Sequence, residues 1–309
     1  MVPPCIFRRR TVEINHLSPL QTSFPDLRII TDRSNRVMAQ STPTSSELVQ
    51  SLLDHPGSLR AAVGVVIPAY NEEPVIAACL NSLRPFQEAG DPILVVNAAS
   101  TDRTADIARQ AGVWVFQAAS TSRGLAVETG VRELMVLEIP LEAVLIVHAD
   151  MELSPPVRPL LIQALRAHPE APGGSLGHRI AAPGAVYRLI EWGNWCRARF
   201  LQIPYGDQAQ FFRPSALPAL GGFPRQECLE DLELSLRMRK IGPLIYLNLP
   251  VRISARHWQR GIVSATVRNW GTVLRYLARR RFLAQNYPNP VIHTAGEAGK
   301  STEIDPRPG

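Results

Sequence analysis

Short apolar runs alternate four times with segments of helical periodicity between residues 63 and 153. The runs begin at Val63, Ile93, Val113 and Val144 and are rich in valine and isoleucine. Such runs are typical of strands that are buried on both faces of a sheet. Strands that alternate with helices over short connections require a parallel sheet covered by helices. We therefore predict an α/β fold with a mostly parallel central sheet.

Polar side chains follow the first, second and fourth of these runs. Ligands bind outside the carboxyl ends of the strands in open parallel sheets, so this edge is the expected ligand site. Asp150 follows the fourth run directly. It could instead only cap the helix expected after Ser154, but the polar residues after the two earlier strands favour a ligand role. Those residues are Tyr70, Asn71, Glu72, Asn97, Ser100 and Asp102.

The same loops carry signals for helix starts. We expect Asn71 to be the N-cap of the helix after the first strand, because asparagine is favoured there. The stretch 100–102 is expected to cap the next helix, and the polar loop 120–124 precedes another.

Several function classes lack their motifs. No G-x-G-x-x-G turn follows the first strand and no G-x-x-x-x-G-K-[ST] loop occurs, so a dinucleotide-type Rossmann domain and a P-loop are not expected. The four cysteines form no Cys-x-x-Cys pair, which argues against a zinc site. The net charge is +6, and almost all of the basic residues are arginines, since only Lys240 and Lys300 are lysines. The sequence shows no basic face interleaved with aromatic residues, so a nucleic-acid partner is not expected.

The second half has a different pattern. Residues 184–201 predict an amphipathic helix whose apolar members include Leu189, Trp192 and Phe200. This helix could pack on the sheet, or it could face a membrane surface or an acceptor. A strand is expected at 209–213, a helix from about 227 to Ile241, and a final helix ending near Arg281.

The predicted boundaries enclose one domain. Residues 1–60 show no sustained periodicity and are expected to form a disordered extension, with Met38 as an alternative start. A single domain is expected over 61–283, with a donor half at 61–153 and an acceptor half at 154–283. Residues 284–309 are expected to form a flexible tail. No run approaches the roughly 18 apolar residues of a membrane span, and the N-terminus makes a poor secretory signal.

The ordered motifs resemble family 2 glycosyltransferases with the GT-A fold. They are Ile67-Pro68-Ala69-Tyr70-Asn71-Glu72-Glu73, Asn97 to Thr104, His148-Ala149-Asp150, Gly206-Asp207-Gln208, Gly221-Gly222-Phe223-Pro224, Glu230-Asp231 and Ser254-Ala255-Arg256-His257-Trp258. The later motifs resemble a bacterial subgroup of small soluble enzymes that are often encoded beside radical-SAM or selenium-related genes.

The resemblance implies a hexosyltransferase-type enzyme that takes a sugar from a nucleotide-diphosphate donor. Asp150 matches the metal-binding carboxylate of the family's Asp-x-Asp, with His148 in place of the first Asp. Mg²⁺ or Mn²⁺ would stabilise the charge on the leaving diphosphate. Arg256 and Arg260 would clamp that diphosphate. The donor-binding residues implied are Pro68, Tyr70, Glu72, Asn97, Ser100, Asp102, Arg123, Ala149, Arg256, Trp258 and Arg260.

The resemblance also implies an inverting reaction with Asp231 as the base that takes the proton of an acceptor hydroxyl. Glu230 belongs to the same motif, although both carboxylates could instead only interact with the dipole of the helix they begin. Gly206, Asp207 and Gln208 are implied at the acceptor, which is a lipid, a glycan or a small metabolite. We expect the protein in the cytoplasm, with peripheral contact to the inner face of the membrane as a further possibility.

Some residues depart from the family's pattern. The motif after the second strand usually reads Asp-Gly-Gly-Ser, whereas this chain has Asn97-Ala98-Ala99-Ser100. His257 stands where a second arginine is common, and Glu128 stands where the subgroup favours Asn. The changed loop leaves a second hypothesis open, namely a degenerate protein that binds a nucleotide sugar without turnover and acts as a sensor or partner subunit.

Overall fold

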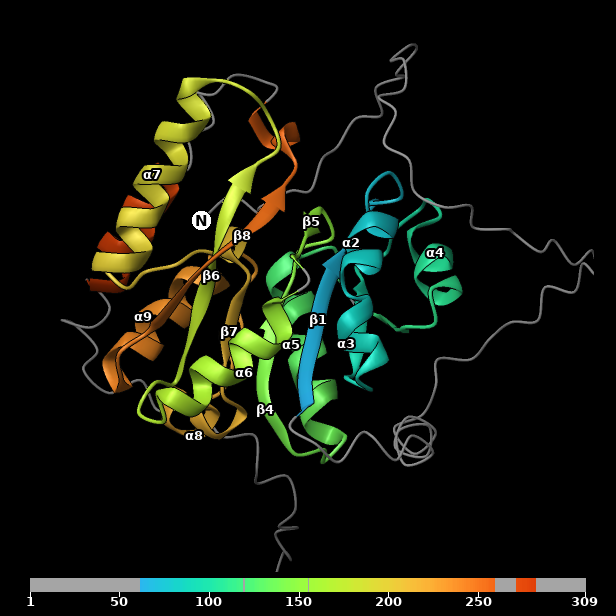
Figure 1. Ribbon diagram of the computed structural model, residues 1–309, viewed down its shortest axis with the longest axis horizontal. Helices are drawn as coiled ribbons and strands as arrows, with labels where there is room; N and C mark the ends of the chain where they lie inside the picture. The colour runs from blue at the N-terminus through green and yellow to red at the C-terminus, as the bar shows by residue number, and fades with distance from the viewer. Residues whose placement is uncertain (1–61, 119, 155, 259–270, 282–309) are drawn as a thin grey trace, which may run out of the picture. The chain divides into compact units, whose positions relative to one another are not determined.

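The computed structural model describes residues 62–118, 120–154, 156–258 and 271–281 (Figure 1). The predictions for residues 1–60 and 284–309, and those for Met38 and Arg260, lie outside the described residues. The chain divides into two compact units, Met1–Ala255 and Arg256–Gly309, which are described separately.

An eight-stranded sheet forms the centre of the first unit, in the order β3-β2-β1-β4-β7-β6-β8-β5. The first four strands in this order are parallel, which confirms the predicted parallel sheet. β7 runs antiparallel to β4 and β6, and β5 runs antiparallel to β8, so the second half is mixed as expected. The strands are β1 Ala62–Ala69, β2 Ile93–Asn97, β3 Trp114–Gln117, β4 Leu141–Ile146, β5 Met151–Glu152, β6 Gly173–Ile180, β7 Gln210–Phe212 and β8 Ile245–Ile253.

Helices cover both faces of the sheet. The helix α5 packs on β1 and β2, and its buried residues Val127, Val131 and Leu134 join one apolar core with Val66 and Val144. Figure 1 shows α6 crossing in front of β4 and β7. The α-helices of the first unit are α2 Ile76–Ser82, α3 Arg84–Glu88, α4 Thr104–Gln110, α5 Arg123–Val136, α6 Val157–Ala167, α7 Ala185–Phe200, α8 Leu217–Leu220 and α9 Glu230–Ile241.

The strands β6 and β8 pair in parallel. The sequence did not predict either strand. β6 begins Gly173-Gly174-Ser175, a composition that disfavours strands. The structure explains the glycine at 174, because a β-carbon there would lie 2.0 Å from the carbonyl oxygen of Ile245. β8 contains Pro250, at which the register with β6 shifts.

Asn71 is not the N-cap of a helix. The helix after β1 begins at Ile76, and Asn71 has a φ of 52° in the left-handed region. Its side-chain oxygen instead accepts a hydrogen bond from the backbone N–H of Thr101, at 2.8 Å. Asparagine tolerates the left-handed region better than most residues, so the same residue type suits a turn as well as a cap.

The amphipathic helix predicted at 184–201 is present as α7. α7 packs on β6, which is one of the two predicted alternatives, with Ala198 buried and with Glu191 and Asn194 bonded to that strand. Leu189, Trp192 and Phe200 are nevertheless exposed, because hydrophobic spacing identifies a face but not the direction in which it points.

The N-cap of α4 is Arg103 rather than a residue of the predicted stretch 100–102, and α9 begins at Glu230 rather than near residue 227. α9 ends before Gly242, as expected for a helix stopped by glycine. Residues 271–281 of the second unit are helical. Within the described residues, none of the helices has both the length and the apolar character that crossing a membrane requires.

Candidate active site

Hydrogen bonds join the loops that follow β1 and β2. The backbone N–H of Asn71 donates to Ser100 Oγ at 3.0 Å, and that of Glu72 donates to Thr104 Oγ1 at 2.8 Å. Asp102 accepts from the backbone of Glu73 and of Thr104. Four of the predicted donor-binding residues, Tyr70, Glu72, Ser100 and Asp102, therefore lie on two neighbouring loops, the first of which begins at Tyr70 directly after β1. Ser100 and Asp102 hold these loops together, a role that the sequence did not indicate.

Asn97 is buried at the end of β2. Its side-chain nitrogen donates to Gln117 Oε1 at 2.9 Å, and its side-chain oxygen accepts from the backbone of Ser100 at 3.2 Å. The Asn97 side chain thus organises its own loop, which contains Ala99 at a φ of 58°.

The chain turns sharply after β4. The backbone N–H of Met151 donates to the carbonyl oxygen of His148 at 3.0 Å, which places Ala149 and Asp150 in the turn. Ala149 is buried, whereas His148 and Asp150 are partly exposed. Burial lowers the pKa of His148 to about 4 and nearby Arg123 acts in the same direction, against three carboxylates that raise it. The His148 ring is therefore held neutral.

Arg123 is the first residue of α5, whose N-cap Ser122 accepts from the backbone of Leu125. Its Nε donates to Glu230 Oε1 at 2.8 Å, and a second guanidinium nitrogen lies 3.7 Å from Asp231 Oδ2. Arg123 therefore contacts both carboxylates of the predicted catalytic motif, a contact that its prediction as a donor-binding residue did not include.

Asp231 lies in the first turn of α9 and is held from two sides. Oδ2 accepts from the backbone N–H of Gly206 at 2.8 Å, and Oδ1 accepts from that of Leu232 at 2.8 Å. Burial raises the pKa of Asp231, but Arg123 and these two N–H groups outweigh it, so the pKa lies below its usual value. The group is a carboxylate at neutral pH.

Glu230 differs from Asp231 although the two are neighbours. Its side chain is almost fully buried, and burial raises its pKa while Arg123 opposes the rise. Its Oε1 accepts from Arg123, while its buried Oε2 has no hydrogen-bond partner among the described residues.

Gly206 brings the two halves of the candidate site together. A β-carbon on Gly206 would lie 2.9 Å from His148 Nε2 and 3.1 Å from Asp231 Oδ2. Only a glycine leaves both side chains undisturbed here. The turn that carries Asp150 and the helix that carries Asp231 therefore meet at one residue.

The turn Gly206–Gln208 supplies the other predicted acceptor residues. Asp207 Oδ1 is buried and has no hydrogen-bond partner among the described residues. The Gln208 side chain accepts from Arg197 at 3.3 Å, and the Arg197 guanidinium lies over the Tyr205 ring, 3.4 Å from its centre. Arg197 and Tyr205 were not predicted, because an arginine on an amphipathic helix gives no sign that it points inward.

Three predicted donor-binding residues lie apart from this description. Arg256 and Trp258 belong to a 3-10 helix, Ala255–Trp258, that begins at the boundary of the first unit, and both residues fall in the second unit. Arg260 lies outside the described residues. Pro68 belongs to the first unit and lies in β1.

The site carries carboxylates but no preformed metal cluster. Among the described residues, no group of three or more His, Cys, Asp or Glu side chains could hold a metal ion. Asp150, Asp207 and Asp231 are nevertheless all close enough to raise the pKa of His148. A cation here would take one or two protein carboxylates and complete its shell with ligand oxygens, which suits Mg²⁺ or Mn²⁺.

Comparison with known proteins decides the family. A family model described as glycosyl transferase family 2 matches residues 64–218, about half of the chain. The chain belongs to glycosyl transferase family 2. The matched range contains both polar loops, the turn after β4 and the Gly206–Gln208 turn. It ends before Asp231.

Solved structures show the same fold. Mannosyltransferase PcManGT from Pyrobaculum calidifontis, in complex with GDP-Man and Mn²⁺, is 21% identical with a TM-score of 0.50, over 69% of this chain and 64% of that one. S. aureus TarS 1-349 with UDP-GlcNAc is 18% identical with a TM-score of 0.47, over 63% and 59%. Mycobacterium tuberculosis glucosyl-3-phosphoglycerate synthase with Mn²⁺ and UDP-glucose is 18% identical with a TM-score of 0.47, over 65% and 73%.

The chain spans about six-tenths of the length of the TarS chain it matches. No curated protein sequence matches it significantly. The GT-A fold that the sequence predicted is confirmed by the family match and by the similarity to PcManGT.

Proposed function

We propose that this family 2 protein is an inverting glycosyltransferase that moves a sugar from a nucleotide-diphosphate donor to an acceptor hydroxyl, with Asp231 as the base. The observation that carries the proposal is the position of Gly206, whose amide donates to Asp231 and whose α-carbon lies against the His148 ring. The candidate base therefore lies next to the turn of the candidate donor site. PcManGT, of similar fold, was solved with a nucleotide sugar.

The reaction is a single displacement. The acceptor oxygen attacks the anomeric carbon, the bond from that carbon to the diphosphate oxygen breaks, and the acceptor proton passes to the Asp231 carboxylate. The lowered pKa of Asp231 supports this role because the group must be ionised to accept the proton. Each Asp231 oxygen accepts one backbone hydrogen bond and keeps a lone pair for the hydroxyl.

Arg123 and Glu230 position the base. Arg123 donates to Glu230 and lies 3.7 Å from Asp231, so it keeps Asp231 ionised without taking its lone pairs in a short hydrogen bond. Asp207, whose buried Oδ1 has no hydrogen-bond partner among the described residues, would accept from a second acceptor hydroxyl. Gly206 and Gln208 fix that turn.

A divalent cation fits this edge. Asp150 would hold Mg²⁺ or Mn²⁺ together with diphosphate oxygens, and the neutral His148 beside it adds no charge that would repel the ion. When bound, the ion supplies charge stabilisation for the departing diphosphate. The loops with Pro68, Tyr70, Glu72, Asn97, Ser100 and Asp102 would hold the nucleoside, with Ala149 in the turn between them. Arg256 and Arg260 would clamp the diphosphate, and Trp258 would be a further donor-binding residue.

Three finer assignments belong to the same proposal. The motifs of the second half support membership of the bacterial subgroup that is associated with radical-SAM or selenium-related genes. The acceptor is a lipid, a glycan or a small metabolite. The proposed location is the cytoplasm.

The test separates an enzyme from a nucleotide-sugar sensor. In Asp231→Asn, release of nucleoside diphosphate from nucleotide sugars should fall by about 10² to 10⁴-fold, the usual contribution of a general base. Donor affinity, measured by calorimetry, should stay within about threefold, because Asp231 acts on the acceptor.

Glu233→Gln is the matched control. Glu233 lies in the same first turn of α9 but pairs with Arg237, at 2.9 Å, so turnover should be unchanged. Full turnover in the Asp231 variant would place the base elsewhere. A wild-type protein that binds a donor but never releases diphosphate would support the sensor instead.

A further inference from the structure

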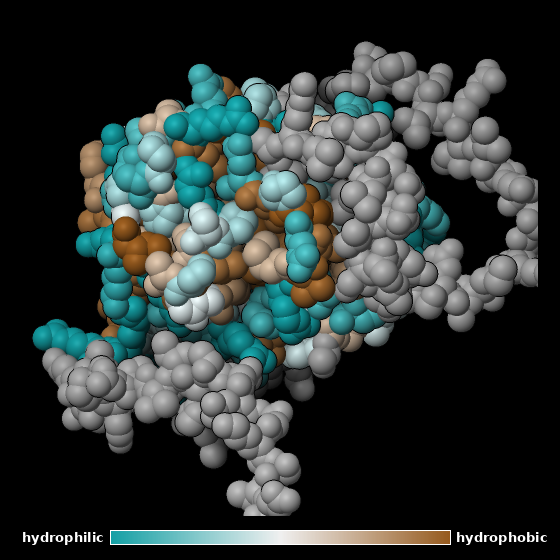
Figure 2. All heavy atoms as spheres, turned by 90° about the horizontal axis from the view of Figure 1, so that it is seen from below, coloured by the Kyte–Doolittle hydropathy of each residue, from teal (hydrophilic) through white to brown (hydrophobic). Residues whose placement is uncertain are grey.

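The helix α7 presents its apolar side outward. Val186, Leu189, Trp192 and Phe200 are exposed by 43%, 65%, 62% and 66%. The first three recur at intervals of three residues and Phe200 follows about two turns later, so they share one side of the helix. Figure 2 shows that apolar residues lie among polar ones on the surface of the molecule.

Polar side chains occupy the inward side and are bonded to the fold. Glu191 accepts from the backbone of Ile180 at 2.7 Å, and Asn194 lies 3.2 Å from the ring nitrogen of His178. Arg197 donates to Gln208 and also to the backbone carbonyl of Ile203. Turning the apolar side inward would break every one of these bonds. The exposed face is therefore a consequence of how α7 is anchored.

An exposed face of this kind gains from being covered. Burying a leucine or a larger apolar side chain typically contributes about 1.5 to 3 kcal/mol, and this face offers four of them. Single exposed apolar residues are ordinary on protein surfaces, whereas several on one helix face mark a binding surface.

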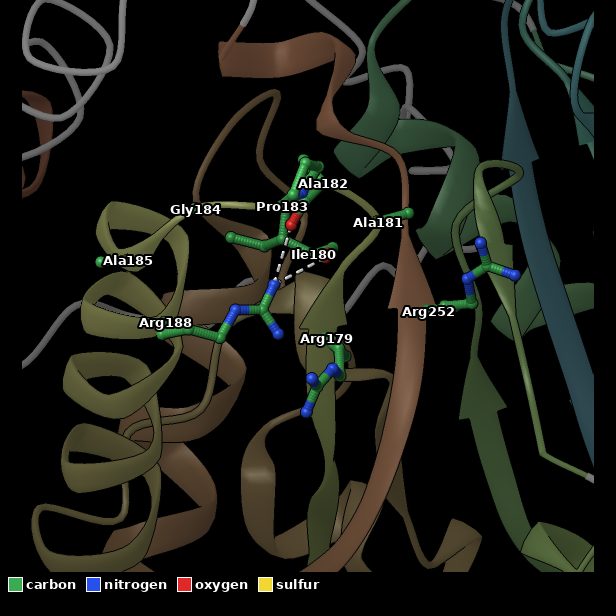
Figure 3. Close-up of a pocket in the computed structure, with 9 residues that line it drawn as sticks. All are labelled: Arg179, Ile180, Ala181, Ala182, Pro183, Gly184, Ala185, Arg188 and Arg252. Carbon is green, nitrogen blue, oxygen red and sulfur yellow. Dashed lines mark hydrogen bonds between the residues drawn. The ribbon is translucent and has the colours of Figure 1, made fainter.

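Charge indicates which occupant suits the face. At the start of α7, a pocket of about 460 Å³ is lined by Arg179, Arg188 and Arg252, which come from β6, α7 and β8 (Figure 3). Arg199 is exposed near the other end of the helix. The one acidic residue in the sequence of α7, Glu191, is turned inward. Arg188 is bonded inward to Ile180, Ala182 and Glu191, whereas Arg179 and Arg199 are exposed. Exposed arginines on the same part of the molecule as exposed apolar residues match the anionic headgroups and acyl chains of a lipid bilayer.

A second copy of the chain suits the face less well. A symmetric pair formed through α7 would bring the same arginines of both copies to one interface, and like charges that face each other weaken such a contact. Phosphate groups of lipids instead match the guanidinium group geometrically.

We propose that α7 docks the protein on the surface of an anionic bilayer, with Leu189 and Trp192 among the acyl chains and with Arg179 and Arg199 at the headgroups. Through Arg197, on its inward side, the same helix contacts the turn Gly206–Gln208 of the candidate acceptor site. The docking does not depend on glycosyl transfer and is tested without it.

The experiment is sedimentation of the full chain with lipid vesicles. Vesicles that contain about one third phosphatidylglycerol should bind the protein, and phosphatidylcholine alone should bind it at least tenfold more weakly. Leu189→Ser/Trp192→Ser should lower binding to anionic vesicles by at least about tenfold, because the lost apolar area no longer inserts. Arg179→Gln/Arg199→Gln should lower it by about fivefold per arginine and should reduce its salt dependence.

Val136→Ser/Leu160→Ser is the matched control. Both residues are exposed apolar residues of other helices, at 51% and 37%, and their loss should leave vesicle binding unchanged. The proposal fails if the wild-type protein does not bind anionic vesicles or if the α7 variants bind them as tightly as wild type does. It also fails if wild type is a dimer that the α7 variant dissociates without any change in vesicle binding, since that result assigns the face to a second copy. Donor affinity measured on the same variants reports separately on the glycosyltransferase proposal.

Discussion

Ala99 occupies a backbone conformation that disfavours its own side chain. Its φ of 58° is left-handed, which costs a residue with a β-carbon about 1 to 2 kcal/mol. The family's usual Asp-Gly-Gly-Ser motif has glycine at this position. The structure thus explains that glycine from the backbone and leaves the alanine of this chain under strain.

Replacing Ala99 with glycine should therefore stabilise the protein. We expect Ala99→Gly to raise the free energy of unfolding by about 0.5 kcal/mol, the strain released less the entropy that glycine adds to the unfolded chain. The neighbouring Ala98 is buried and has no such strain, so Ala98→Gly should lower it by about 1 kcal/mol. Denaturant unfolding of both variants checks the pair, and shifts of the same sign would contradict this explanation.

In the proposed mechanism, Arg123 sets the pH range in which Asp231 can act as a base. Burial raises the pKa of Asp231, and Arg123 is the first of the influences that lower it. Removing the charge in Arg123→Gln should therefore raise that pKa, so that the acid limb of turnover moves to higher pH. Diphosphate release measured as a function of pH tests this.

Arg132→Gln is the control for that pH profile, because Arg132 lies on the same helix and pairs with Glu133 at 3.1 Å on the surface. Its profile should match that of wild type. Superimposable acid limbs for the Arg123 variant and wild type would show that Arg123 does not keep Asp231 ionised.

At the scale of elements, the strand pair β6 and β8 depends on close backbone approach. A β-carbon on Gly174 would lie 2.0 Å from the carbonyl oxygen of Ile245, so Gly174→Ala must separate the strands. We expect a loss of about 3 kcal/mol, the upper range for overpacking. Thermal unfolding should show a fall of several degrees.

Gly193 gives the opposite case in the same half of the chain. It lies inside α7, and within the described part of the chain no other heavy atom comes within 4 Å of a β-carbon placed on it. Gly193→Ala should therefore raise the free energy of unfolding by about 1 kcal/mol through helix propensity. A stabilised Gly174 variant or a destabilised Gly193 variant would contradict the packing described here.

The elements that the sequence predicted are those that follow local rules. β1, β2 and β4 each contain an uninterrupted apolar run, and α9 ends before Gly242 as helices commonly do. β6 and β8 were missed because glycine and proline normally exclude strands, and their fit here depends on a partner far away in the sequence. The inward turn of Glu191 and Arg197 likewise depends on bonds to β6 and to the turn at Gln208.

In the candidate site, too, local sequence patterns could be predicted and contacts between distant residues could not. Asp150 and Asp231 could be named from motifs in the sequence, but their meeting at Gly206 could not, because residues 148, 206 and 231 come together only when the sheet is built. The contact between Arg123 and Glu230 joins residues 107 positions apart and carries no local signal. Sequence motifs therefore identified the carboxylates of the candidate site, whereas their contact partners became known only from the fold.

At the scale of the whole molecule, the account rests on one claim, that the edge after β1, β2 and β4 binds a nucleoside diphosphate through a divalent cation at Asp150. Calorimetric titration of a panel of nucleoside diphosphates, with and without Mn²⁺, tests it most directly. Wild type should bind one nucleotide at least about tenfold more tightly with Mn²⁺, and Asp150→Ala should lose that metal dependence. A folded wild-type protein that gives no heat with any nucleotide, or an Asp150 variant that binds as wild type does, would contradict the account.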